Sequence, residues 1–246
     1  MLLQILTYTH HLTTMLFGIF LSAFFLGVKQ NKKNVCILLG GGAVSGLFFL
    51  ICNTVFGSLF TEAVYPIFVH LPLFLLLVFY YRFRWLPSII SIMTAYLCCQ
   101  FSNWAGIFAL SLSGLEWVYY LVRIIVTVAV FAFLSRYLCQ TTALLLAKSD
   151  RELYILGAMP FVYYVFDYST TKFSMLLYSG NKVVVEFLAF AMCISYVIFL
   201  FVYFQEYELK NRAEQYGQLT NMQLNSLHSE IEQIRSSEHR MKILRH

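Results

Sequence analysis

Charged residues are scarce in this chain of 246 residues: Asp, Glu, Lys and Arg together make up 12% of it. A soluble globular domain usually contains about 25% of these residues. Hydrophobic residues reach 60%, which is more than a soluble surface of this size can cover. The composition therefore disfavours a soluble enzyme, a disordered tail and a nucleic-acid-binding module, and it predicts a multi-pass membrane protein.

Several motifs are also missing. No Lys or Arg precedes Lys29, so the first apolar segment lacks the basic region of a cleavable signal peptide. The six cysteines form no C-x-x-C motif and no metal-ligand spacing with His, so we interpret them as packing residues and expect no metal site. The absence of an H-E-x-x-H motif and of paired Asp residues on adjacent segments argues against an intramembrane hydrolase.

Seven apolar segments are long enough to cross a bilayer, which takes about 20 residues per helix. The sixth is the shortest and contains Pro160, and Pro72 predicts a kink in the third because proline removes a backbone donor. The predicted fold is therefore an all-α membrane bundle of about seven helices. The predicted spans are residues 3–28, 35–56, 63–81, 86–112, 117–138, 153–168 and 183–204.

The positions of Lys and Arg predict the orientation of these spans, since cytoplasmic loops are enriched in both. If the N-terminus lies outside, the outer loops contain only Lys172 and Lys182. The net charge of +5 is then an orientation signal, and no nucleic acid partner is implied. The C-terminus is predicted inside. The basic residues of the predicted inner loops are Lys29, Lys32, Lys33, Arg82, Arg84, Arg136, Lys148 and Arg151.

The composition changes after Phe204, and this change predicts two domains: a transmembrane domain at residues 1–204 and a cytoplasmic helix at residues 205–246. The second segment has no Pro and only one Gly, so a continuous helix of about 60 Å is expected. A heptad pattern predicts a parallel homodimeric coiled coil. A solvated amphipathic helix lying along the membrane or another domain is the alternative. The core positions of the coil include Leu224, Leu227, Ile231, Ile234 and Met241.

The chain ends at His246 within an amphipathic helix, without a cap or C-terminal Gly, which favours a polypeptide that continues further. Residues 237–246 read Ser-Glu-His-Arg-Met-Lys-Ile-Leu-Arg-His. This segment resembles the start of the phosphoacceptor box of bacterial sensor histidine kinases, in the group with a GHKL-type ATP-binding domain that is related to peptide-pheromone receptors.

The resemblance implies the sensor and linker part of a two-component histidine kinase in the bacterial cell membrane, with His246 as phosphoacceptor. It implies a homodimer, a response regulator as partner, and a signal that is an extracellular peptide or another small amphiphile. The parent enzyme would autophosphorylate with ATP and Mg²⁺, which a domain outside these 246 residues would bind. A non-enzymatic membrane receptor or scaffold is the alternative. A transporter fits less well, since internal repeats are not evident.

Ionisable residues inside membrane spans are costly and are therefore candidates for function. Arg123, Asp167 and Glu186 all fall in the outer half of the predicted bundle, where they are candidates for contact with a peptide or amphiphile. A purely structural alternative is that Arg123 pairs with one of the two acids and holds helices together, or that each of the three side chains extends to the membrane interface. His70 and the pair Tyr163–Tyr164 are interpreted as packing residues.

Overall fold

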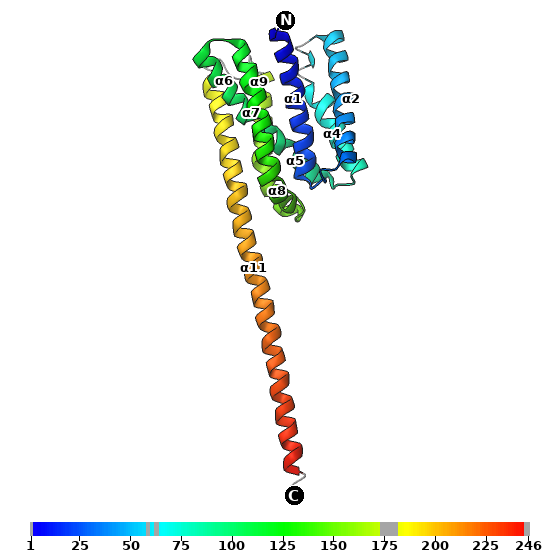
Figure 1. Cartoon of the computed structure of the whole chain (residues 1–246), viewed down its shortest axis with the longest axis vertical. Helices are drawn as coiled ribbons and strands as arrows, with labels where there is room; N and C mark the ends of the chain where they lie inside the picture. The colour runs from blue at the N-terminus through cyan, green and yellow to red at the C-terminus, as the bar shows by residue number, and fades with distance from the viewer. Residues whose placement is uncertain (1, 58–59, 62–63, 173–181, 244–246) are drawn as a thin grey trace. The chain divides into compact units, whose positions relative to one another are not determined.

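The computed structural model of the chain describes residues 2–57, 60–61, 64–172 and 182–243, with the side chains of residues 151, 168–187 and 235–246 left out. Within this described part every regular element is a helix (Figure 1). The predicted all-α class is therefore confirmed. The chain divides into two compact units, residues 1–200 and 201–246.

Each of the predicted apolar segments coincides with helical structure. The first unit also contains a short helix, α8, that the sequence did not predict. The elements are α1 (Leu2–Phe25), α2 (Lys32–Phe56), η1 (Pro66–His70), α4 (Leu71–Leu75), η2 (Leu76–Tyr80), α5 (Trp85–Cys98), α6 (Gln100–Ser113), α7 (Glu116–Tyr137), α8 (Cys139–Leu146), α9 (Asp150–Lys172) and the first part of α11 (Lys182–Ile243).

Four helical stretches within the described residues are long and apolar enough to cross a membrane, judged by length and composition. Large apolar side chains are exposed along them. On α2, Leu47, Ile51 and Val55 follow one another at every fourth position and are 61%, 52% and 65% exposed. Such a continuous apolar face is unfavourable in water. The four stretches are Lys32–Phe56, Trp85–Ser113, Glu116–Tyr137 and Leu188–Ile234.

Local sequence signals fix several helix ends. The side chain of Asn31 accepts a hydrogen bond from the backbone N–H of Asn34 at 2.8 Å and so caps the start of α2. Gly114 ends α6 with φ of 66°, a left-handed conformation that glycine adopts without a steric penalty. Helix α2 therefore begins, and helix α6 ends, close to the predicted boundaries.

The third predicted span is irregular on both sides of Pro72. The π-helical turn η1 precedes the short α-helix α4, and a second π-helical turn, η2, follows it. Pro72 lies in the first turn of α4, where its missing N–H costs least. The kink expected at Pro72 therefore takes the form of wider, π-helical turns on both sides of α4.

The fourth and sixth segments differ in detail from the prediction, and a helix lies in the predicted loop between the fifth and the sixth. The fourth is divided at Cys99 into α5 and α6, and α9 runs continuously through Pro160 from Asp150 to Lys172. Helix α8 lies between Arg136 and Lys148, whose charges favoured a loop. It forms a helix because its apolar face packs against α1, with Leu145 and neighbouring residues buried.

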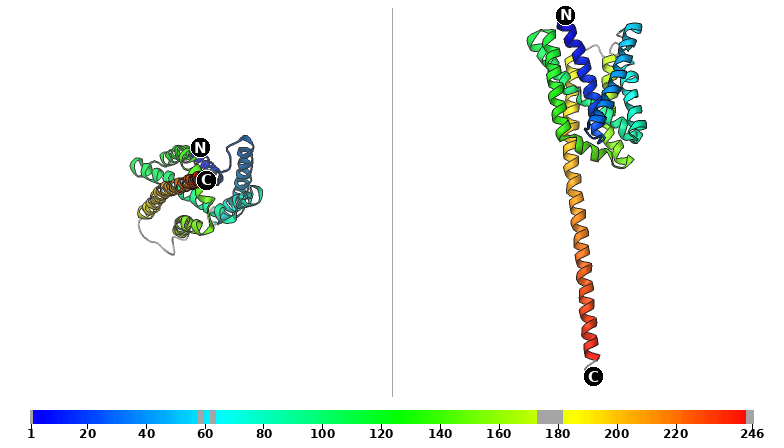
Figure 2. Two further views of the ribbon diagram at one scale, coloured as in Figure 1. Left: turned by 90° about the horizontal axis from the view of Figure 1, so that it is seen from below. Right: turned by 45° about the vertical axis from the view of Figure 1, so that its right-hand side comes forward.

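Helix α1 forms the centre of the first unit and packs against α7, α5, α8 and α2 (Figures 1 and 2). The Ser91 hydroxyl of α5 donates a hydrogen bond to the Ser22 carbonyl of α1 at 2.5 Å. Helix α5 packs on α9, and α6 packs on α7. The first part of α11 joins this assembly because the Tyr196 hydroxyl donates to the Leu156 carbonyl of α9 at 3.0 Å.

The second unit consists of the remainder of α11. The helix runs without interruption through residues 201–243, so the predicted continuous helix is confirmed. Four predicted coil positions form an exposed apolar stripe on it: Leu224, Leu227, Ile231 and Ile234 are 58%, 55%, 57% and 62% exposed. The side chain of Met241 lies outside the described residues. The dimeric coil stays a prediction.

Candidate functional site

Asp167 is the most deeply buried of the candidate charged residues. It lies on α9 with only 6% of its surface exposed. The hydroxyl of Tyr96 on α5 donates a hydrogen bond to its Oδ2 at 2.6 Å. A hydrogen bond to a buried carboxylate is among the stronger ones in proteins, so this contact ties α9 to α5.

Further polar side chains extend this contact into what we call the Asp167 cluster: Asp167, Tyr96, His70, Tyr164, Tyr163 and Gln100. The His70 Nδ1 lies 3.0 Å from the Tyr164 hydroxyl, and the Gln100 amide donates to the Tyr163 hydroxyl. The ring centroids of His70 and Tyr96 are 5.5 Å apart. The cluster therefore connects η1, α5, α6 and α9 through hydrogen bonds and ring contacts.

Arg123 lies on α7 in different surroundings. Its guanidinium donates to the Tyr119 hydroxyl one turn earlier and lies 5.1 Å from the centroid of the Tyr119 ring. His10 of α1 is 4% exposed and lies within electrostatic range of Arg123, and its ring centroid is 5.8 Å from that of Tyr120 in a tilted arrangement. We call His10, Tyr119, Tyr120 and Arg123 the Arg123 cluster.

A glycine on α6, Gly106, allows the Arg123 cluster to pack closely against that helix. A Cβ atom built on Gly106 would overlap the Arg123 Cγ and come within 2.8 Å of its Cδ and 3.1 Å of the Tyr119 ring. The aliphatic part of Arg123 therefore lies directly on the α6 backbone. This packing restricts the rotamers of Arg123 and holds its charged end in place.

The three predicted ligand-sensing residues have different outcomes. Arg123 donates a hydrogen bond to Tyr119, and Asp167 accepts one from Tyr96, so the two charged residues contact different tyrosines. The side chain of Glu186 lies outside the described residues. A joint pocket of all three stays a prediction.

Tyr96 was not among the predicted candidates, whereas the interpretation of His70 and the pair Tyr163–Tyr164 as packing residues agrees with their contacts between helices. Tyr96 lies within an apolar segment with no charge nearby in sequence, and its partner Asp167 is 71 residues away. Their contact depends on how α5 and α9 pack. The sequence indicates that an acidic residue inside a span requires a hydrogen-bond donor. It does not indicate which residue supplies that donor.

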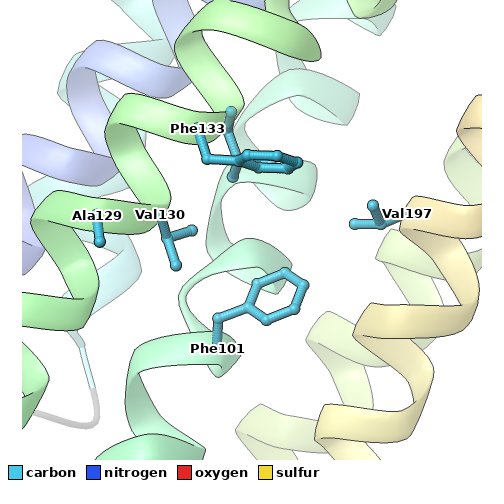
Figure 3. A pocket seen from close by; sticks show the side chains of 6 residues that line it. Phe101, Ala129, Val130, Phe133 and Val197 are labelled. Atoms are coloured by element: carbon cyan, nitrogen blue, oxygen red, sulfur yellow. The ribbon is translucent and has the colours of Figure 1, made fainter.

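A separate apolar pocket of about 270 Å³ lies among α6, α7 and the first part of α11. Figure 3 shows the ring of Phe133 above the ring of Phe101, with Val197 facing both from α11. The remaining lining residues are Ala129, Val130 and Leu134. Phe133 is 50% exposed, so the pocket opens to the outside of the bundle, where apolar chains of a membrane would reach it.

Ion pairs lie near the junction between α8 and α9. Arg84 pairs with Asp150 and donates to the Lys148 carbonyl at 3.0 Å, which links the start of α5 to the start of α9. Lys148 pairs with Glu152 at 3.5 Å. Desolvation acts to raise the pKa of Glu152, but the hydrogen bond from Ser149 and the charge of Lys148 outweigh it and lower the pKa overall.

Within the described part of the chain, no three His, Cys, Asp or Glu side chains are close enough together to hold a metal ion. The phosphoacceptor candidate His246 lies outside the described residues. No family model, curated protein or solved structure matches the chain. Function is therefore inferred from the arrangement of its own residues.

Proposed function

We propose that this chain is the sensor and signalling-helix part of a membrane histidine protein kinase of a two-component system. In this proposal its apolar helices span a bacterial cell membrane about seven times, with the N-terminus outside and the C-terminus inside. A signal received in the bundle would change the position of α11. That change would reach the phosphoacceptor His246 through the coil.

The continuity of α11 is the observation that carries the proposal. One helix begins at Lys182, packs in the bundle through Tyr196, and continues to Ile243 without a break. A helix transmits rotation or translation along its length because its backbone hydrogen bonds resist bending. In this proposal the predicted last span and the predicted cytoplasmic coil act as one mechanical element.

The exposed stripe on α11 supports a homodimer. Leu224, Leu227, Ile231 and Ile234 repeat with heptad spacing and leave more than half of each side chain exposed in a single chain. Pairing with a second copy would bury this stripe, and burial of apolar surface contributes about 25 cal/mol per Å². A dimer would also bring two phosphoacceptor helices together, as phosphoryl transfer within a helical dimer requires.

The chemistry at His246 follows from the resemblance of residues 237–246 to a phosphoacceptor box. Imidazole is nucleophilic at neutral pH, so it can accept a phosphoryl group and pass it to a carboxylate of a response regulator. ATP and Mg²⁺ would be bound by a further domain of the parent enzyme. The residues of this chain would position the histidine and control its access.

Disulfide cross-linking in native membranes tests the coil. In a Cys36→Ser background, which removes an exposed cysteine, Leu227→Cys or Ile231→Cys should give a disulfide-linked dimer under mild oxidation. Ser229→Cys, on the opposite face of the same helix, is the matched control and should stay monomeric. Adding Leu227→Asp to Ile231→Cys should abolish the cross-link. Equal cross-linking at all three cysteine positions would refute the coil.

Reading the source DNA beyond the codon for His246 tests the kinase assignment. The proposal expects the frame to continue with Asp, a basic helix and then Asn-containing and Gly-rich boxes. In that full frame, His246→Gln should remove acid-labile phosphate after incubation with ATP, and His239→Gln should retain it. A stop codon directly after His246 would instead favour a membrane receptor or scaffold that recruits a cytoplasmic partner through its coil.

A further inference from the structure

Among the side chains that the structure describes, no Asp or Glu forms an ion pair with Arg123. Helix α7 faces the first part of α11 across the apolar pocket, and its most extensive contacts are with α1, α6 and α8. Their described residues, 2–25, 100–113 and 139–146, include no Asp or Glu. On α7 itself, Glu116 lies two turns away and is exposed. Asp167 on α9 accepts a hydrogen bond from Tyr96, and the side chain of Glu186 on α11 lies outside the described residues.

The guanidinium of Arg123 is also short of acceptors. One of its terminal nitrogens, Nη1, donates to Tyr119, while its Nε is buried and has no hydrogen-bond partner among the described residues. A buried hydrogen-bond donor without an acceptor is unfavourable in free energy, and the cost is larger when the donor is charged and lies inside an apolar segment. A ligand that supplies oxygen atoms would relieve this cost.

The neighbours of Arg123 suit an anion. His10 is buried on the facing helix within electrostatic range of Arg123, and its Nδ1 lies 3.4 Å from the Thr14 hydroxyl. In the tautomer in which Nδ1 accepts from Thr14, Nε2 carries the proton and can donate it to an anion. The Tyr119 hydroxyl accepts from Arg123 and keeps its own proton for donation to a third group. Gly106 holds the stem of Arg123 against α6, so the charged end is positioned before a ligand arrives.

We propose that the Arg123 cluster binds an oxyanion, a carboxylate or a phosphate, that is carried on an apolar molecule within the membrane. The arginine supplies charge and planar donors that match such a group, and His10 and Tyr119 supply two further donors. This inference deepens the proposed function, because it gives the sensed signal a chemical class. The oxyanion comes from a membrane lipid or from an added amphiphile.

Binding of charged and neutral amphiphiles to the full chain tests the proposal. The protein is placed in phosphatidylcholine nanodiscs and titrated with dodecyl phosphate or dodecanoate, and with dodecanol as a neutral probe of equal chain length. We expect the two anions to bind saturably and at least tenfold more tightly than dodecanol. This comparison uses the unaltered protein, so it does not depend on whether a variant folds.

Substitutions of single residues test whether Arg123 binds the anion. Arg123→Gln should weaken dodecyl phosphate binding roughly tenfold or more, since hydrogen bonds to a charged group are lost. Arg123→Lys should retain part of the affinity, because it keeps the charge without the planar donors. Arg136→Gln is the matched control: it removes an exposed arginine from the last turn of the same helix and should leave binding unchanged.

Mass spectrometry of lipids extracted from the purified proteins distinguishes the two sources. An anionic lipid retained by the unaltered protein and lost in Arg123→Gln identifies a membrane lipid, whereas saturable dodecyl phosphate binding without a retained lipid identifies an added amphiphile. Equal affinity for dodecanol and the anions overturns the proposal, as does the absence of both binding and a retained lipid. Neither readout involves the α11 coil, so failure of the kinase assignment is recognised separately.

Discussion

Gly157 allows α9 to approach α5 at the side chain of Ile90. A Cβ atom built on Gly157 would lie 2.7 Å from the Cγ1 of Ile90 and 2.8 Å from its Cδ1, closer than such atoms pack. Ile90 is itself buried, so it has little room to move. Close approach of helices through a small residue is typical of membrane bundles.

Gly157→Ala should therefore destabilise the bundle. Overpacking of this kind costs about 1–3 kcal/mol, which exceeds the gain of up to about 1 kcal/mol from the better helix propensity of alanine. The expected result is a lower melting temperature of the purified protein, followed by loss of the monodisperse peak in size-exclusion chromatography after heating. Gly40→Ala is the matched control, because nothing lies within 4 Å of its Cβ position; it should melt at the same temperature or higher.

The hydrogen bond between Tyr96 and Asp167 gives a second prediction for single residues. Tyr96→Phe keeps the ring and removes the hydroxyl that donates to the buried carboxylate, which should cost about 1.5–3 kcal/mol. The same heating assay measures it. Tyr154→Phe removes a hydroxyl from a side chain that is 61% exposed on α9 and should have no effect. Equal melting temperatures for the two variants would show that the contact contributes little.

At the scale of elements, the sequence predicted where helices occur better than how they are shaped. Apolar runs and the caps at Asn31 and Gly114 determine helix positions, and these signals are local. The division at Cys99 and the helix α8 were missed because they depend on packing: α8 is helical since its buried face contacts α1, whereas the basic residues on both sides of it favoured a loop.

Gly217 is the only glycine in the polar part of α11, and nothing lies within 4 Å of its Cβ position. Glycine within a helix is less favourable than alanine by about 1 kcal/mol. Gly217→Ala should therefore slow hydrogen exchange of the backbone amides on both sides of position 217. Exchange in residues 85–113 serves as the internal reference and should not change. Unchanged exchange around position 217 would indicate that this segment is not limited by helix opening.

At the scale of the whole molecule, the candidate site was only partly predictable. Arg123 and Asp167 were recognised because charges in apolar segments are conspicuous. Their partners were not, since Tyr96 precedes Asp167 by 71 residues and His10 precedes Arg123 by more than a hundred. Contacts of that kind arise when α1 packs on α7 and α5 packs on α9. A hydropathy pattern contains no information about which helices become neighbours.

The orientation of the bundle is a property of the whole chain, and loop labelling tests it. Positive charge predicts residues 29–34 on the cytoplasmic side and the turn at residues 113–114 outside. In a Cys36→Ser background, Ser113→Cys should react with a membrane-impermeant maleimide in intact cells. Gln30→Cys should react only after the cells are permeabilised.

The same experiment determines from which leaflet of the membrane the proposed anion site is reached. With the N-terminus outside, Arg123 lies two turns from the outer end of α7, so an amphiphile would present its oxyanion from the outer leaflet. Arg136, in the last turn, would then face the inner leaflet. If Gln30→Cys is labelled in intact cells and Ser113→Cys is not, the orientation is reversed. Arg123 would then bind anions from the cytoplasmic leaflet, and α11 would extend outside the cell, where no response regulator could meet it.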